Sequence, residues 1–226
     1  MANIKDVVKA QEGDVFDIEL EKDVLDANRK LAQENRILLK KHGIKAIDIM
    51  GAIGAGKTSL ITRLVEHLKD RYRIAAFKGD LTTTIDAEMI GHHNVEVVAI
   101  NTGKECHLDA NLIKKALQRL NLDSINLLFI ENVGNLICPA EFPLGSEKRM
   151  VVISVTEGPY MVVKHPFIFM EANVVAINKI DLARAMAVDV KELEADVKRI
   201  NPKAEVVATN CRTGNGIQEV VEALGL

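Results

Sequence analysis

The segment Gly51–Thr58, with the sequence GAIGAGKT, constrains the fold most strongly, because it matches G-x-x-x-x-G-K-S/T at every fixed position. It follows the apolar run IKAIDIM and precedes the amphipathic run SLITRLVEHLKD, so it joins an expected strand to an expected helix. Glycines let the backbone wrap closely around a phosphate, and the helix start adds partial positive charge. We expect Lys57 to contact the outer phosphates of a nucleotide and the Thr58 hydroxyl to ligate Mg²⁺. The expected phosphate-binding residues are Gly51, Ala52, Ile53, Gly54, Ala55, Gly56, Lys57, Thr58 and Ser59.

Short apolar runs alternate with longer helical segments from residue 44 onward. Several runs are almost entirely Val, Ile and Leu, which is typical of strands covered on both faces in a parallel sheet. The alternation predicts an α/β fold with a mostly parallel sheet of about seven strands, flanked by helices and binding ligands at the strands' carboxyl ends. The expected strands are Ile44–Met50, Arg73–Lys78, Val95–Ile100, Ile125–Ile130, Met150–Val155, Asn173–Ile177 and Glu205–Ala208. The expected helices are Ser59–Asp70, Leu108–Leu120, Val188–Ile200 and Ile217–Leu224.

A further amphipathic helix is expected over Asp23–His42, where Leu and Ile recur with charges between them, and it should end at Gly43. The sequence is thus divided into an N-terminal helical extension, residues 1–43, and a nucleotide-binding domain, residues 44–226. Two interpretations of the helix stay open. It either packs against its own domain or reaches a partner chain.

Composition excludes several classes of function. The 29 Lys and Arg against 32 Asp and Glu leave a net charge of −3, which does not favour nucleic acid or a membrane surface as partner. No Trp and 4% aromatic residues disfavour a stacking platform for single strands. No apolar run has signal-peptide length near the start or the roughly 20 residues of a spanning helix elsewhere. Three cysteines in 226 residues indicate reduced thiols, so we expect a cytoplasmic protein.

Two acidic residues end expected strands near the phosphate loop. Asp80 ends RIAAFKGD, and Glu131 ends INLLFIEN. Both should project toward the phosphates, where Mg²⁺ needs oxygen ligands, so Thr58, Asp80 and Glu131 form the expected magnesium site. Asp80 either positions a water or binds the metal, and Gly134 is placed to offer an N–H group to a γ-phosphate. The alternative for each acid is a solvated side chain at a strand end. The candidate catalytic residues are Lys57, Asp80 and Glu131.

The motif Asn178-Lys179-Ile180-Asp181 follows the strand VVAI and indicates guanine recognition. Asp181 can accept from both N1–H and the 2-amino group, while Asn178 and Lys179 frame the O6/N7 side and the ring face. Adenine lacks the 2-amino group and would leave buried polar groups unpaired, so GTP is the expected nucleotide. Backbone N–H groups of a later loop should contact the same base, and its residues are Thr209, Asn210 and Cys211. A strand-end turn without a ligand is the alternative.

Cys106, His107 and Cys138 are candidate ligands of a softer metal ion. They follow two strand ends that a parallel sheet can bring together, and two thiolates with an imidazole suit Zn²⁺ or Ni²⁺ better than Mg²⁺. One chain offers three ligands, so water or the same residues of a second copy would complete the site. The alternative is small buried cysteines and a capping histidine. Cys211 is better explained as a small residue of the base loop, and the pair His92–His93 as polar surface.

Taken together, the segments GAIGAGKT, KGDLTTTIDA, NTGKECHLDA, ENVGNLICP and NKID resemble the hydrogenase nickel-incorporation GTPases, the HypB family of the SIMIBI class. The resemblance extends from about Leu25 to the end and implies a homodimer promoted by GTP. It also implies that Cys106, His107 and Cys138 bind zinc or nickel near the dimer interface. The implied role is assistance in nickel delivery to the large subunit of NiFe hydrogenase, with a partner metallochaperone.

One departure from this family is that the first 43 residues hold no cysteine and only His42, whereas many members carry an N-terminal cysteine-rich or histidine-rich nickel motif. We therefore expect the protein to lack nickel storage and to rely on the domain site. The related urease accessory GTPase has a Cys-Pro-His motif, and the adjacency of Cys106 and His107 disfavours that interpretation.

The leading hypothesis is a nucleotide switch that hydrolyses GTP slowly, since no side chain unambiguously orients the attacking water. Thr82–Asp86 is the expected switch segment, and residues 131–138 link Glu131 to Cys138, so nucleotide state should alter metal affinity. Three rivals remain. They are a urease-type or other metallocentre-assembly GTPase, a non-catalytic metal-binding module stabilised by nucleotide, and a kinase that uses ATP.

Overall fold

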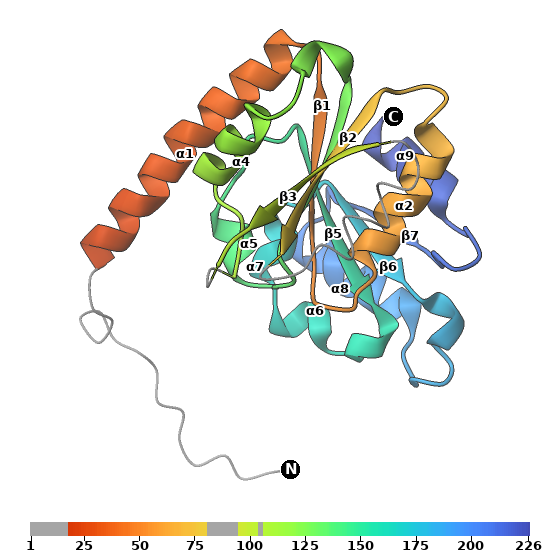
Figure 1. Cartoon of the computed structure of the whole chain (residues 1–226). Helices are drawn as coiled ribbons and strands as arrows, with labels where there is room; N and C mark the ends of the chain where they lie inside the picture. Colours follow the sequence, from red (N-terminus) through yellow and green to blue (C-terminus); the bar gives the residue numbers. More distant parts are fainter. Residues whose placement is uncertain (1–17, 81–94, 104–105) are drawn as a thin grey trace.

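A parallel sheet forms the centre of the molecule (Figure 1). The computed structural model describes residues 18–80, 95–103 and 106–226, without the side chains of residues 18–21 and 80. Within these residues seven parallel strands follow the order β3-β2-β4-β1-β5-β6-β7. Because all run the same way, their carboxyl ends share one edge of the sheet. The strands are β1 (Lys45–Met50), β2 (Ile74–Asp80), β3 (Glu96–Asn101), β4 (Leu127–Glu131), β5 (Lys148–Ser154), β6 (Val174–Asn178) and β7 (Glu205–Ala208).

Helices cover both faces of this sheet (Figure 1). On one face, α2 (Lys57–Leu68) and α9 (Ile217–Leu224) bury one apolar cluster with β1, β4 and β5. On the other, α1 (Ile18–Lys41) and α4 (Ala110–Leu117) lie over β1, β2 and β4, and a third cluster joins α8 (Val190–Ile200) to β5 and β6. The short helices are α5 (Cys138–Glu141), α6 (Met161–Lys164), α7 (Phe167–Met170), η1 (Leu122–Ser124), η2 (Val155–Glu157) and η3 (Ile180–Leu182).

The predicted α/β fold is confirmed, and the differences lie at the ends of elements. β5 begins at Lys148 rather than Met150, because Lys148 pairs with Ile47 and backbone pairing does not require an apolar side chain. α2 begins at Lys57 rather than Ser59, so the phosphate-loop lysine lies in the first helical turn. The helix expected over Asp23–His42 begins earlier, at Ile18. None of the described helices is long and apolar enough to cross a bilayer.

α1 packs against its own domain, which was the first of the two interpretations. Its inner face includes Ala32 and Leu39, both buried, and Leu39 belongs to the apolar cluster shared with α4. Ile37, on the outer face, is 59% exposed. The chain leaves the helix through Gly43 at a φ of 66°, the left-handed conformation that favours glycine.

Two buried asparagines fasten α1 to the rest of the domain. The Asn28 side chain accepts from Ala110 N at 2.7 Å and donates to Pro143 O at 2.9 Å. Asn35 Nδ2 donates to Ala110 O at 2.8 Å and to Leu144 O at 3.2 Å. Together they bind both backbone groups of Ala110, the first residue of α4, and they satisfy carbonyls that burial would otherwise leave unpaired.

Replacing Asn35 with Ala should lower the free energy of unfolding by about 2 kcal/mol, because two buried carbonyls lose their donor. Urea denaturation followed by circular dichroism measures the change. Lys30→Ala, an exposed position of the same helix, is the matched control and should change the value by less than about 0.5 kcal/mol. A loss for Asn35→Ala no larger than the control's would show that these hydrogen bonds do not hold α1.

Candidate functional site

The phosphate loop joins β1 to α2 at the carboxyl edge of the sheet. Lys57 Nζ donates to Gly51 O at 3.0 Å and to Ala52 O at 2.9 Å, so the loop curls around its own lysine. Gly51 lies so close to β5 that a Cβ there would stand 2.1 Å from Val152 O. Gly56 precedes α2 at a φ of 103° and, being a glycine, offers no side chain that could cap the helix N-terminus. A helix N-terminus and an ammonium thus lie beside the same glycine-rich loop, and both favour the binding of an anion.

The candidate magnesium ligands Thr58 and Glu131 are in direct contact. Thr58 Oγ1 donates to the two Glu131 carboxylate oxygens at 2.8 and 3.1 Å. Glu131 also forms an ion pair with Lys78, a buried lysine that the sequence analysis did not single out. The sequence feature that could have indicated Lys78 is its place as a single lysine within the largely apolar run IAAFKGD. Asp80 ends β2, and its side chain lies outside the described part of the chain.

The predicted base-recognition motif touches the phosphate loop. Asn178 is buried at the end of β6, and its Nδ2 donates to Ala55 O at 3.0 Å. Its Oδ1 accepts from Cys211 N at 3.2 Å, which joins the motif to the loop after β7. Lys179, at a φ of 60°, donates from Nζ to Gly54 O at 2.7 Å. One asparagine and one lysine therefore fix the distance between the two halves of a nucleotide site.

A cavity of about 580 Å³ lies between these segments and is large enough for a base and a ribose. Asp181 lines its mouth and pairs there with Arg212, with Oδ2 and Nη2 3.2 Å apart. Arg63 on α2 donates to Cys211 O and Arg212 O at 2.8 and 3.0 Å, which holds this loop in place. Burial raises the pKa of the Cys211 thiol to about 11, so it stays protonated at neutral pH. The residues that line this cavity are Gly56, Ser59, Asn178, Lys179, Asp181, Leu182, Asn210, Cys211 and Arg212.

The three candidate ligands of a softer metal converge. Cys106, His107 and Cys138 present ligand atoms within 4.8 Å of one another, and all three are half-buried. The two Sγ atoms are 2.8 Å apart, and Cys106 Sγ lies 3.9 Å from His107 Nδ1. The hydrogen bond that the Cys138 thiol shares with Cys106 raises the pKa of this thiol, and burial adds to the effect. Two sulfurs so close repel as thiolates, and a bound cation would remove that penalty.

A buried polar network positions both segments that carry the candidate metal ligands, and the sequence analysis missed it. Asn132 Oδ1 accepts from Leu108 N at 3.0 Å, which fixes the residue after His107, and Asn132 Nδ2 donates to Asp48 Oδ1 at 3.3 Å. Arg149 donates to Pro139 O at 2.6 Å, which fixes the residue after Cys138. Burial raises the pKa of Asp48, opposed by Arg149, whose Nε lies 3.6 Å from Oδ2. The only local feature of the sequence that could have indicated this network is Asp48, a charged residue inside the apolar run IKAIDIM.

The segment after β4 connects the phosphate loop with the thiols. Asn135 N donates to Gly51 O at 3.1 Å, while Asn135 Nδ2 donates to Cys138 Sγ at 3.4 Å. Gly134 lies against the phosphate loop, since a Cβ there would stand 2.3 Å from Ile53 Cγ1. The candidate phosphate site and the candidate metal site are thus connected through a single residue, Asn135, which contacts both.

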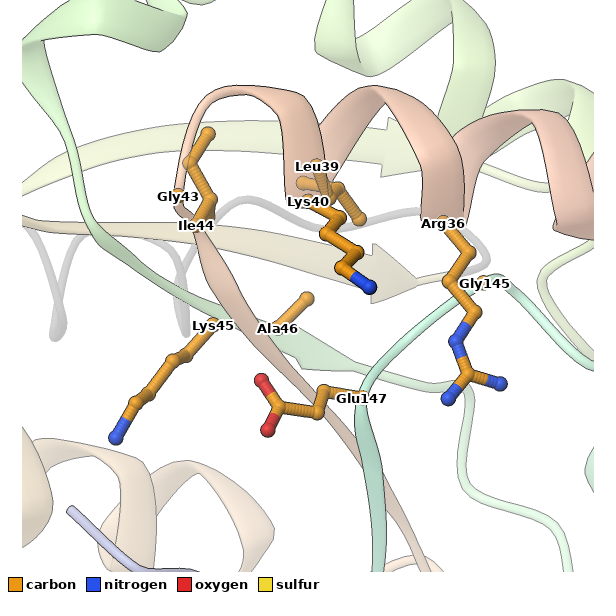
Figure 2. Close-up of a pocket in the computed structure, with 9 residues that line it drawn as sticks. All are labelled: Arg36, Leu39, Lys40, Gly43, Ile44, Lys45, Ala46, Gly145 and Glu147. Carbon is orange, nitrogen blue, oxygen red and sulfur yellow. The ribbon is translucent and has the colours of Figure 1, made fainter.

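A second cavity, of about 360 Å³, lies at the opposite edge of the sheet. It opens beside the end of α1, and Figure 2 shows the Lys40 ammonium and the Glu147 carboxylate directed into it. No predicted site residue lines it. The expected switch segment Thr82–Asp86 and the pair His92–His93 lie outside the described residues.

The sheet, with a glycine-rich phosphate loop between β1 and α2, defines a P-loop nucleotide-binding protein. The family model described as "CobW/HypB/UreG, nucleotide-binding domain" matches residues 45–208, from the first residue of β1 to the last of β7.

Similar proteins narrow this class. A protein of Methanocaldococcus jannaschii named "Probable hydrogenase maturation factor HypB" is 56% identical over 205 residues, covering 91% of this chain and 93% of the relative. The crystal structure of HypB from Archaeoglobus fulgidus has a TM-score of 0.83 and 44% identity, covering 88% of this chain and 98% of that one. HypB from Helicobacter pylori, crystallised in complex with nickel, has a TM-score of 0.83 and 31% identity, covering 88% and 93%. The chain belongs to the HypB hydrogenase maturation factors of the CobW/HypB/UreG family.

Replacing Asn132 with Ala should lower the affinity for Ni²⁺ by about 10- to 100-fold, because the residue after His107 loses its acceptor and the ligand segment loses its position. Titration against a chromophoric chelator measures the affinity. Asn121→Ala, which removes an asparagine that caps η1, is the control and should leave it unchanged. Equal affinities for Asn132→Ala and wild type would show that the network does not position the ligands.

Proposed function

We propose that this protein is a GTP-binding metallochaperone that hydrolyses GTP slowly, forms a homodimer and assists nickel delivery during the maturation of NiFe hydrogenase. The observation that carries the proposal is the contact of Asn178 and Lys179 with the phosphate loop, because it sets a base-reading motif at a fixed distance from a phosphate cradle. In this proposal residues 44–226 form the GTPase domain and residues 1–43 extend it.

The nucleotide is bound at two ends. The phosphate loop and the Lys57 ammonium hold the phosphates, and Asp181 accepts from the guanine edge once it leaves Arg212. Bound Mg²⁺ supplies charge neutralisation, with Thr58, Asp80 and Glu131 as its proposed ligands. The catalytic residues proposed are Lys57, Asp80 and Glu131, and the lack of an assigned water-orienting group favours a low turnover.

Nickel is the proposed cargo of the cysteine–histidine site, since a relative of this family has been crystallised with nickel. Zinc suits the same donors. Cys106, His107 and Cys138 supply three ligands, and a second copy across a two-fold axis, or water, completes the coordination. A partner metallochaperone and the hydrogenase large subunit are the proposed protein partners, in the cytoplasm.

Nucleotide and metal are proposed to be coupled through Asn135. Gly51 O accepts from both Lys57 Nζ and Asn135 N, so a change in the phosphate loop acts on the residue that donates to Cys138 Sγ. Linkage requires that metal then change nucleotide affinity by the same factor.

Replacing Asp181 with Asn should lower GTP affinity by about 100-fold and restore binding and hydrolysis with xanthosine triphosphate, whose 2-oxo group accepts a hydrogen bond where guanine donates one. Isothermal titration and phosphate release measure the two properties. Asp70→Asn, at an exposed position after α2, is the control. Tight binding of ATP, or an unchanged preference in Asp181→Asn, would contradict guanine recognition by this motif.

Replacing Asn135 with Ala should make Ni²⁺ affinity independent of nucleotide, while the wild type should bind Ni²⁺ with affinities that differ about fivefold or more between its GDP and GTP-analogue forms. Competition titrations on the two forms measure this. Asn215→Ala, at an exposed position of the base loop, serves as control and should keep the difference. Equal nickel affinities in the two wild-type forms would remove the coupling from the proposal.

A further inference from the structure

Lys78 occupies an unusual position for a lysine. It lies in β2, it pairs in register with Glu131 of the neighbouring strand β4, and both side chains point to the face that α2 covers. Its side chain is 7% exposed and that of Glu131 is 1% exposed. Lysine is almost never buried this deeply unless it is paired, because the desolvation of its charge is costly.

The Lys78 ammonium lies among the groups proposed to bind a divalent cation. It forms an ion pair with Glu131 Oε1, and it lies 3.4 Å from Thr58 Oγ1. Thr58 Oγ1 in turn donates to Glu131. The carboxylate and the hydroxyl that would ligate Mg²⁺ are therefore both in contact with a cation that the chain itself carries.

We propose that Lys78 is a positioning residue, an internal cation that holds Glu131 and Thr58 in place and competes with a divalent ion for them. The proposal rests on the assignment of Thr58 and Glu131 as magnesium ligands. An ammonium and a divalent ion on the same Glu131 carboxylate repel each other, so binding of the ion weakens or displaces the pair with Lys78. Such a displacement lowers the apparent affinity by the fraction of protein in which Glu131 is released.

This competition has a functional consequence. A divalent ion alone gains less from Thr58 and Glu131 than an ion that arrives with a triphosphate, because the triphosphate brings additional ligands. The ammonium thus favours loading of Mg²⁺ together with nucleotide. A lysine is suited to this exchange, because its compact charge sits on a flexible four-carbon stem and can turn away without moving the strand.

Binding of Mn²⁺ to the full chain without nucleotide, followed by electron paramagnetic resonance, tests the proposal. Lys78→Gln should bind Mn²⁺ about tenfold more tightly than the wild type, because the competing charge is gone and the amide still donates to Glu131. Lys78→Met should bind at least as tightly and should show a larger rise in melting temperature on Mn²⁺ addition than the wild type. Lys69→Met, an exposed lysine after α2, is the matched control and should behave as the wild type. The double variant Lys78→Gln, Glu131→Gln should lose the gain.

Equal Mn²⁺ affinities for Lys78→Gln and wild type would overturn the proposal and leave Lys78 with a purely structural ion pair. A gain that persists in the double variant would also overturn it, since the ion would then bind elsewhere. Both measurements are made without nucleotide, so they are independent of whether the protein binds GTP. A failure of the wild type to bind GTP would refute the proposed function, whereas the proposal for Lys78 would still be decided by the Mn²⁺ measurements.

Discussion

The carbonyl group of Gly51 joins the functional parts of the molecule. It accepts from Lys57 Nζ at 3.0 Å and from Asn135 N at 3.1 Å, so the lysine of the phosphate loop and the segment leading to the thiols share one acceptor. The close packing of this glycine against Val152 fixes the carbonyl in place, because any side chain would collide with β5. The proposed nucleotide site and the proposed metal site are therefore connected through the same backbone atom rather than built on separate loops.

The fold was predictable because its signals are local. Runs of Val, Ile and Leu mark strands buried on both faces, and the phosphate loop marks one strand–helix junction, so the α/β sheet followed from patterns that need no partner. The ends of β5 and α2 were misplaced, since pairing of Lys148 with Ile47 and the turn at Gly56 decide them. The grouping of Cys106, His107 and Cys138 was also accessible, because strand ends of a parallel sheet share an edge.

The residues that support the site were not predictable, because their partners are distant in sequence. Lys78 and Arg212 have no local pattern that would name Glu131 or Asp181 as their counter-ions. Asn132 directly follows a residue that was identified, yet its bond to Leu108 N depends on where the loop after β3 passes. Side chains that bind ligands recur in motifs, whereas those that hold the ligand-binding residues are chosen by three-dimensional packing.

The hydrogen bonds that hold α1 on the domain also affect the surroundings of His107. Asn28 and Asn35 of this helix form hydrogen bonds with the backbone of Ala110, three positions beyond His107. The same two side chains donate to the carbonyls of the two residues after Phe142. The Phe142 ring lies 3.9 Å from the imidazole of His107. α1 therefore holds the chain on both sides of His107, through Ala110 and through the carbonyls that follow the Phe142 ring. A change in the position of α1 would therefore displace the segments that hold His107, so this helix helps to set the geometry of the candidate metal site.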